Sequence, residues 1–311
     1  MKFVLHGRSW LLDVCSYPDG LHGRPKYVIL AGSGEQNPAS GMGATVELRG
    51  TVGILTGASR GIGVYLAREL AAAGANLALA ARSSDGLEEV AAMVRGRGVG
   101  VITVPTDVTK RSELQRLVKR TNEELGVVEL LVNNAGIEKY TFFEATEPND
   151  IESILRTNVL GPELLTRYVL PQMIERRKGH IVNMASASGV TALPFNTAYS
   201  SSKHAIVGFS RSLREEMVPY NIGVSVICPG YVRDAGMFHV SKGGAAPPGL
   251  TATVSPERVV SRTIKAIERN KPEVIVASRL VNIVDVLHAL APRFTTMMAR
   301  RSGAYEFNEP H

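Results

Sequence analysis

A tyrosine and a lysine four residues apart, Tyr199 and Lys203, are the side chains of this sequence best suited to proton transfer. This spacing places both on one face of a helix, one turn apart. A phenol with a pKa of about 10 is a weak acid and base at neutral pH, but a neighbouring ammonium is expected to lower that pKa. We therefore expect Tyr199 to donate or accept a proton. Ser186, thirteen residues earlier, could hydrogen-bond an oxygen on which charge develops.

A glycine-rich segment lies between a short apolar run and a helical pattern, and it favours phosphate binding. Gly57 would allow a tight turn, Gly61 a close approach of a pyrophosphate, and Gly63 close packing of the helix on the strand. The free N–H groups at the start of the helix would then face the anion. The alternative is a glycine-rich turn that serves packing alone. The residues predicted here to contact a dinucleotide are Gly57, Ser59, Arg60, Gly61, Ile62 and Gly63.

The end of the second predicted strand decides which nicotinamide cofactor is favoured. An acidic residue there would bind the adenine ribose hydroxyls and repel a 2′-phosphate. The sequence has Arg82 instead of a carboxylate, and Arg82 with Arg60 could hold a phosphate through charge-assisted hydrogen bonds. We therefore expect NADP(H), with NAD(H) as the alternative. Both arginines could also be ordinary surface charges.

The elements that must position these side chains alternate between short apolar runs and longer helical patterns. Runs that are apolar throughout are typical of strands buried on both faces of a parallel sheet. The sequence thus predicts a doubly wound α/β fold of about seven parallel strands with helices on both faces. The expected strands are residues 52–57, 76–81, 99–105, 128–134, 180–186, 223–229 and 273–277, with helices at 64–73 and 112–125 among others.

The two ends of the chain differ from this regular part, residues 46–277. Residues 1–45 have no sustained hydrophobic period, and charged residues interrupt any signal-peptide core. Met42 precedes the first strand, so residues 1–41 could reflect a start assigned too far upstream. Residues 278–311 carry an amphipathic helical stripe, which could cover the substrate, pair two subunits or lie on a membrane surface.

Composition excludes several other classes of protein. The 311 residues are 44% hydrophobic and 21% charged, which is ordinary for a globular protein. No run approaches the roughly 18 apolar residues of a membrane-spanning helix. The net charge of +6 is spread along the chain, which argues against nucleic-acid binding. The two cysteines, Cys15 and Cys228, cannot form a disulfide framework, so we expect a cytoplasmic protein. Contact with a membrane surface is the alternative. We expect no metal site.

The motifs together resemble the short-chain dehydrogenase/reductase family over about residues 46–277. They include TGASRGIG, Asp107 in TDV, NNAG at 133–136, Ser186, YSSSK at 199–203 and Pro229-Gly230, in the family's order. The resemblance implies that Lys203 also holds the nicotinamide ribose and that Asn158 kinks its helix and anchors a water in a proton relay. Asp107 could contact the adenine, or it could be a turn or cap residue. Further cofactor contacts implied are Val108, Asn134, Ala135, Gly136, Pro229, Gly230 and Val232, while Asn133 is implied to be mainly structural.

The match loosens after Pro229-Gly230. Asp234 stands where the family commonly has a threonine near the carboxamide, which leaves that contact open. The segment from Ala235 to Leu250 is expected to form a lid, with Met237 and Phe238 as apolar walls for substrate or as ordinary packing residues.

We expect an NADP(H)-dependent enzyme that interconverts a secondary alcohol and a ketone on an apolar small molecule. The apolar substrate is inferred by analogy from the C-terminal tail. The alternatives are reduction of a 3-oxoacyl chain bound to a carrier protein and, in another class, a non-catalytic NADP(H) sensor. A sensor would have no use for the catalytic residues, so the enzyme is favoured. The family usually pairs its subunits, so a homo-oligomer is a further expectation.

Overall fold

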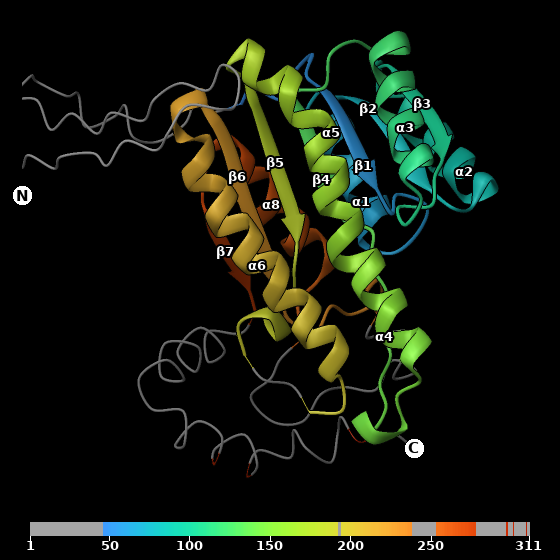
Figure 1. Ribbon diagram of the computed structural model, residues 1–311. Coiled ribbons are helices and arrows are strands. Elements are labelled where there is room, and N and C mark those ends of the chain that lie inside the picture. Colours follow the sequence, from blue (N-terminus) through green and yellow to red (C-terminus); the bar gives the residue numbers. More distant parts are fainter. Residues whose placement is uncertain are drawn as a thin grey trace, which may run out of the picture. The chain divides into compact units, whose positions relative to one another are not determined.

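The computed structural model describes residues 46–191, 194–237 and 253–277, together with Met297, Arg301 and Glu309. Seven strands in this part form one sheet in the order β3-β2-β1-β4-β5-β6-β7, and every neighbouring pair is parallel (Figure 1). The predicted seven-stranded parallel α/β fold is confirmed. The strands are β1 Val52–Thr56, β2 Asn76–Ala81, β3 Val101–Pro105, β4 Leu130–Asn133, β5 Gly179–Met184, β6 Ile222–Pro229 and β7 Glu273–Val276.

Helices cover both faces of the sheet. On one face lie α1 Ile62–Ala72, α2 Ser84–Arg95 and α8 Pro256–Glu268, and on the other α3 Arg111–Glu124, α5 Gly161–Arg176 and α6 Thr197–Met217 (Figure 1). A short helix, α4 Pro148–Leu155, continues through a π-helical turn, η2 Arg156–Leu160, into α5. Three 3₁₀ turns complete the described elements, η1 Phe143–Ala145, η3 Ala187–Gly189 and η4 Val218–Tyr220.

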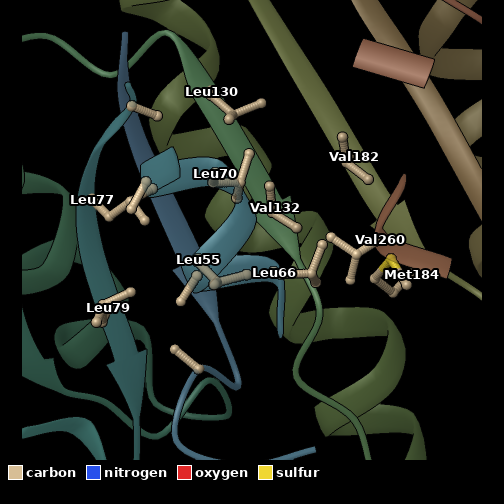
Figure 2. Packing of buried hydrophobic residues seen from close by; sticks show 14 of the residues in the cluster. Leu55, Leu66, Leu70, Leu77, Leu79, Leu130, Val132, Val182, Met184 and Val260 are labelled. Carbon is tan, nitrogen blue, oxygen red and sulfur yellow. The ribbon is translucent and has the colours of Figure 1, made fainter. Parts of the chain in front are cut away.

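The core between α1, α8 and the sheet shows why the strands are apolar along their whole length. Leu66 and Leu70 of α1 point at the central strands, where they meet Leu55 and Val132 (Figure 2). Both leucines of α1 are fully buried, and so is Leu55. Because helices press on the opposite face as well, β1, β4, β5 and β6 are buried at every position.

The strand order also places the binding edge. The chain leaves β1 for β2 on one side and later returns to β4 on the other, so the crossovers diverge between β1 and β4. Ligands of such sheets bind outside the carboxyl ends of the strands at this point. The glycine-rich turn follows β1, and Asn134 follows β4. The fold therefore brings two of the predicted motifs to the same place.

Some sequence predictions lie outside the described residues. These are the irregular segment 1–45 with Met42, Phe238 and most of the predicted lid, and the C-terminal tail 278–311 apart from three single residues. Among the residues that are described, no helix has both the length and the apolar character needed to cross a membrane.

Candidate active site

The glycine-rich turn is held in a conformation that side chains would obstruct. Gly57 has φ +65°, and a Cβ there would lie 2.9 Å from Ala135 Cα. A Cβ on Gly63, in the first turn of α1, would lie 2.0 Å from the carbonyl oxygen of Gly57. Glycine at these two positions thus lets the helix begin directly against the end of β1. Gly63 has the packing role that the sequence predicts for it.

Thr56, the last residue of β1, and Asn134, which follows the neighbouring strand β4, brace this turn. The Asn134 side-chain amide donates to the carbonyl oxygens of Thr56 at 3.0 Å and Gly57 at 3.2 Å. The Thr56 hydroxyl accepts the backbone N–H groups of Asn134 at 3.0 Å and Ala135 at 3.1 Å. Asn134 therefore positions the turn, a role that is distinct from the cofactor contact predicted for it. Asn133 is buried and donates to Thr166 and Asn183, in line with a structural residue.

The start of α1 fits the phosphates of a dinucleotide. Gly61 caps the helix with φ +59° and no side-chain hydrogen bond, and Ile62 is the first helical residue. The positive end of the helix dipole faces the carboxyl edge of the sheet. A Cβ on Gly61 would lie 2.7 Å from the carbonyl oxygen of Ala235, so this glycine also makes room for the segment after β6.

Both arginines predicted to select the cofactor are exposed at one edge of this site. Arg60 belongs to the glycine-rich turn, and Arg82 directly follows β2. The glycine-rich turn and the start of α2 are closely packed there. A Cβ added to Gly86 in α2 would lie only 3.1 Å from the Cβ of Ser59 in the turn. The Ser83 hydroxyl caps α2 by accepting the Gly86 N–H at 3.2 Å. Two exposed cationic side chains and a capped helix thus lie at this edge of the sheet.

Asp107 makes the turn that the sequence analysis named as its alternative. One carboxylate oxygen accepts the backbone N–H of Thr109 at 3.0 Å and its hydroxyl at 2.8 Å. These hydrogen bonds, with the positive charges of Lys110 and Arg82, hold its pKa below the usual value although burial opposes them. Val108 is buried beside it, and its carbonyl oxygen would meet a Cβ on Gly161 at 2.8 Å.

Ser186, Tyr199 and Lys203 meet at the carboxyl end of β5. Tyr199 and Lys203 lie one turn apart in α6 and are 5% and 3% exposed. The Ser186 side chain acts on the Tyr199 hydroxyl and tends to lower its pKa. The hydroxyl of Ser186 also accepts the N–H of Ser188 at 3.2 Å, which fixes its position at the start of η3. The tertiary structure thus brings together the three residues that the sequence singled out.

The prediction that Lys203 lowers the pKa of Tyr199 is wrong. Burial raises the pKa of Tyr199 because the phenolate would lose its solvation, and the negative charge of Glu138 raises it further, while the Ser186 hydrogen bond acts in the opposite direction. Lys203 Nζ donates to the Met184 carbonyl oxygen at 2.9 Å and lies 5.5 Å from the centroid of the Tyr199 ring. The amine is therefore directed at the backbone. Burial lowers the pKa of Lys203 to about 8.

Asn158 lies in the π-helical turn between α4 and α5, so the helix is interrupted at this residue. Its Oδ1 accepts the Ile137 N–H at 2.9 Å, and its Nδ2 donates to the Ile137 carbonyl at 2.8 Å and to the Ser202 hydroxyl at 3.0 Å. A Cβ on Gly136 would lie 3.3 Å from Asn158 Oδ1 and 3.6 Å from Lys203 Nζ. Asn158 therefore fixes the segment after β4 against α6.

The segment after β6 closes this side of the site. Pro229 ends β6, Gly230 donates to the Val276 carbonyl at 3.0 Å, and Val232 is buried and bridges to Val254. Asp234 has φ +63° and an exposed side chain 3.6 Å from Arg233, so it is directed towards solvent. Met237 is half-buried, and the rest of the predicted lid up to Leu250 lies outside the described residues.

The sequence analysis missed three polar residues near Tyr199. Glu138 and Tyr140 follow the NNAG motif, and the negative charge of Glu138 acts on Tyr199, Lys203 and Tyr140. Asn196 is 1% exposed at the start of α6. The sequence did contain a signal for Glu138 and Tyr140, because two polar residues closely follow the NNAG motif at the carboxyl edge of the sheet. The position of Asn196 depended on the fold.

Comparisons with known proteins agree with this arrangement. The family model for short chain dehydrogenases matches residues 51–243. The ketoacyl reductase HetN of Nostoc sp. is 36% identical over 267 residues, which are 84% of this chain and 92% of that protein. Human estradiol 17-beta-dehydrogenase 11 is 34% identical over 258 residues, which cover 82% and 84% of the two chains. A tryptophan-substituted actinorhodin polyketide ketoreductase with NADPH superposes with a TM-score of 0.70 at 27% identity, covering 77% of this chain and 100% of that one.

Proposed function

We propose that this chain, which belongs to the short-chain dehydrogenase/reductase family, is an NADP(H)-dependent ketone reductase. As a member of the family it is an oxidoreductase that acts on CH–OH groups with a nicotinamide cofactor. The substrate is a ketone on a lipophilic carbon skeleton, and the product is the secondary alcohol. Tyr199 supplies the proton to the carbonyl oxygen.

The observation that carries this proposal is that Tyr199 and Lys203, buried one turn apart in α6, meet Ser186 at the carboxyl end of β5. Burial raises the pKa of Tyr199, so the phenol is protonated at neutral pH, and Ser186 supplies a second hydroxyl that could contact the same substrate oxygen. A protonated phenol is suited to proton donation, which reduction of a ketone needs and oxidation of an alcohol does not.

A bound nicotinamide cofactor would supply the hydride that reaches the carbonyl carbon. The residues that fit it are the glycine-rich turn, the start of α1 and, at the ribose beside the ring, Lys203. With a pKa of about 8, Lys203 is mostly an ammonium at neutral pH and could replace its bond to Met184 by a bond to a ribose hydroxyl. Asn158 holds Ser202 and Ile137 in place behind the reacting groups.

The lipophilic substrate is supported by side chains near the site and by the relatives' names. Phe142 and Phe143 are 38% and 57% exposed, and Phe142 stacks edge-on against Phe195, just before α6. The named relatives include an estradiol dehydrogenase and a ketoacyl reductase. The second name supports a runner-up substrate, a 3-oxoacyl chain on a carrier protein, which is also a neutral ketone with an apolar chain.

Replacement Tyr199→Phe tests the mechanism. Loss of the proton donor should lower kcat/KM for ketone reduction by about a thousandfold, within the usual range for general acid catalysis. The assay follows NADPH absorbance with free lipophilic ketones and with carrier-bound 3-oxoacyl chains, and the preferred series identifies the substrate class. Tyr220→Phe, in η4 at the other end of α6, is the matched control. Undiminished activity of Tyr199→Phe would refute this mechanism.

A further inference from the structure

A chain of buried amide and hydroxyl groups connects two strands of the sheet to the helix that carries Tyr199. Asn133 on β4 and Asn183 on β5 are partners in the strand register, and Asn133 Nδ2 donates to Asn183 Oδ1 at 2.9 Å. Asn183 Nδ2 in turn donates to the Ser210 hydroxyl of α6 at 2.9 Å. The three side chains are 3%, 0% and 2% exposed, so this connection, which we call the amide chain, is shielded from water.

The role of each group in the bond between Asn183 and Ser210 is fixed by its neighbours. The Ser210 hydroxyl donates its own proton to the Ile206 carbonyl oxygen at 2.7 Å, so its oxygen is the acceptor for Asn183. A movement of α6 along β5 would take this acceptor away from a fully buried amide. Loss of a buried hydrogen-bond partner is costly, which opposes such a movement.

Both strands carry a group of the candidate site one residue beyond the amide chain. Asn134, which follows Asn133, braces the glycine-rich turn, and the carbonyl oxygen of Met184, which follows Asn183, accepts the bond from Lys203 at 2.9 Å. The amide chain therefore links the turn that fits a dinucleotide to the helix of the proton donor. In the proposed reaction a hydride and a proton reach the two ends of one carbonyl group, so the spacing of these two parts affects the rate.

Two side-chain hydrogen bonds among the described residues join β5 to α6. One runs from Lys203 to Met184, and the other from Asn183 to Ser210. Ser210 lies seven residues, or two turns, after Lys203 on the same face of α6. In the proposed function Lys203 exchanges its bond to Met184 for a bond to a ribose hydroxyl. The bond from Asn183 then remains to hold the helix on the strand while the cofactor is bound.

We propose that Asn183 is a positioning residue for the reaction. It holds α6 against β5, and through Asn133 against β4, so that Tyr199 keeps its place when Lys203 turns to the cofactor. This inference rests on the proposed ketone reduction and adds to it a residue that acts through α6. A displacement of about 1 Å of a reacting group can cost about a hundredfold in rate, so we expect about a tenfold loss from the smaller shift that one missing hydrogen bond allows.

Replacement Ser210→Ala tests this role, because it removes the acceptor on α6 while alanine favours the helix. The substrate is the best one found among the free lipophilic ketones and the carrier-bound 3-oxoacyl chains. Hydride transfer from NADPH is followed in a single turnover, so that product release does not mask the chemical step. We expect the rate constant to fall about tenfold, with KM for the ketone and Kd for NADPH unchanged. A merely structural role would lower the free energy of unfolding and leave this rate constant unchanged.

Ser225→Ala is the matched control, because it deletes a buried hydroxyl at the other end of the sheet. Ser225 is 0% exposed, and its hydroxyl donates to the Lys271 carbonyl oxygen. This variant should lose stability in urea unfolding but transfer hydride at the wild-type rate. Asn183→Ala removes both bonds of the amide and should slow hydride transfer at least as much as Ser210→Ala. If Asn183→Ala does not fold, the comparison of the two serine variants decides.

The outcomes separate this inference from the function it rests on. If the wild-type protein reduces no ketone with NADPH, both proposals fall. If it is active and Ser210→Ala transfers hydride as fast as Ser225→Ala, the positioning role is refuted and the ketone reductase stands. A weaker affinity for NADPH in Ser210→Ala at an unchanged rate would also overturn the role, since the amide chain would then serve the cofactor turn alone.

Discussion

The two ends of strands β5 and β6 each bury titratable side chains, but they use them differently. At the carboxyl ends, Tyr199 and Lys203 are buried next to Ser186, whose side chain is half exposed. At the amino ends, His180 is fully buried against β6, where it pairs in register with Gly223. Burial shifts the pKa at both ends, upward for Tyr199 and downward for Lys203 and for His180, the last to about 3.

The hydrogen bonds at the amino ends form a structural network, in which the buried His180 Nδ1 has no hydrogen-bond partner among the described residues. His180 Nε2 lies 2.8 Å from the Ser225 hydroxyl, which donates to the Lys271 carbonyl at 2.5 Å. Arg214 donates to Val224 and twice to Asn270. A Cβ on Gly223 would lie 2.3 Å from His180 Nδ1, so the neighbouring space is already filled by the chain itself.

This comparison shows that a shifted pKa does not by itself mark a functional site. Ion-pair networks and buried structural groups shift pKa values as well. The carboxyl end differs because it combines the shifted groups with a glycine turn that a Cβ would obstruct, a helix start without a side-chain cap, and a hydroxyl available to a substrate. The site is identified by this combination.

The largest expected effect at the amino end is on stability. Gly223→Ala would place a methyl group against His180 and Asn270 and should lower the free energy of unfolding by about 3 kcal/mol, as overpacking does. NADPH affinity of the folded protein should stay unchanged. Urea unfolding and cofactor titration measure the two quantities. Gly208→Ala is the control, because nothing lies within 4 Å of its added Cβ and alanine favours the helix. A loss of NADPH binding in Gly223→Ala would contradict the independence of the two ends.

At the carboxyl end, Arg82→Asp should change cofactor choice and leave stability almost unaffected. A carboxylate after β2 repels a 2′-phosphate, so we expect the Kd of NADPH to rise about a hundredfold while that of NADH changes little. Fluorescence titration with both cofactors provides the measurement. Arg97→Asp makes the same charge change on an exposed residue beyond α2 and should alter neither Kd. Equal weakening of both cofactors by Arg82→Asp would show that Arg82 is not the selecting residue.

The smallest expected effect is on the free energy of unfolding at acidic pH. We expect His180, near the amino end of β5, to cause its decrease as the pH falls. Its folded-state pKa of about 3 lies below the ordinary value of about 6.5, so the unfolded chain binds a proton that the folded protein excludes. This contribution is complete above about pH 6.5 and is lost progressively as the pH falls towards 3, by about 2 kcal/mol at pH 5. Urea unfolding at pH 7.5 and pH 5 tests it. His180→Asn should flatten the pH dependence, whereas the exposed His204→Asn should not; an unchanged slope in His180→Asn would count against this origin.

Much of the fold and part of the site could be predicted from the sequence. Apolar runs long enough for one strand each predicted β1 to β7, with most boundaries within two residues, because burial on both faces leaves few polar positions. The spacing of Tyr199 and Lys203 predicted their shared helix face, since helical geometry is local. The pKa of Tyr199 was predicted in the wrong direction because burial depends on distant segments, and Lys203 turned out to donate to Met184 on β5.

The chain's residue order by itself determined the glycine turn, the seven strands and the pairing of Tyr199 with Lys203, because each depends on neighbours within a few residues. Only the tertiary structure decided that Asn134, just after β4, braces the turn and that Asn158 holds Ile137. These relations join segments separated by about twenty to eighty residues. Solvation and charge at such contacts are set by the packed fold.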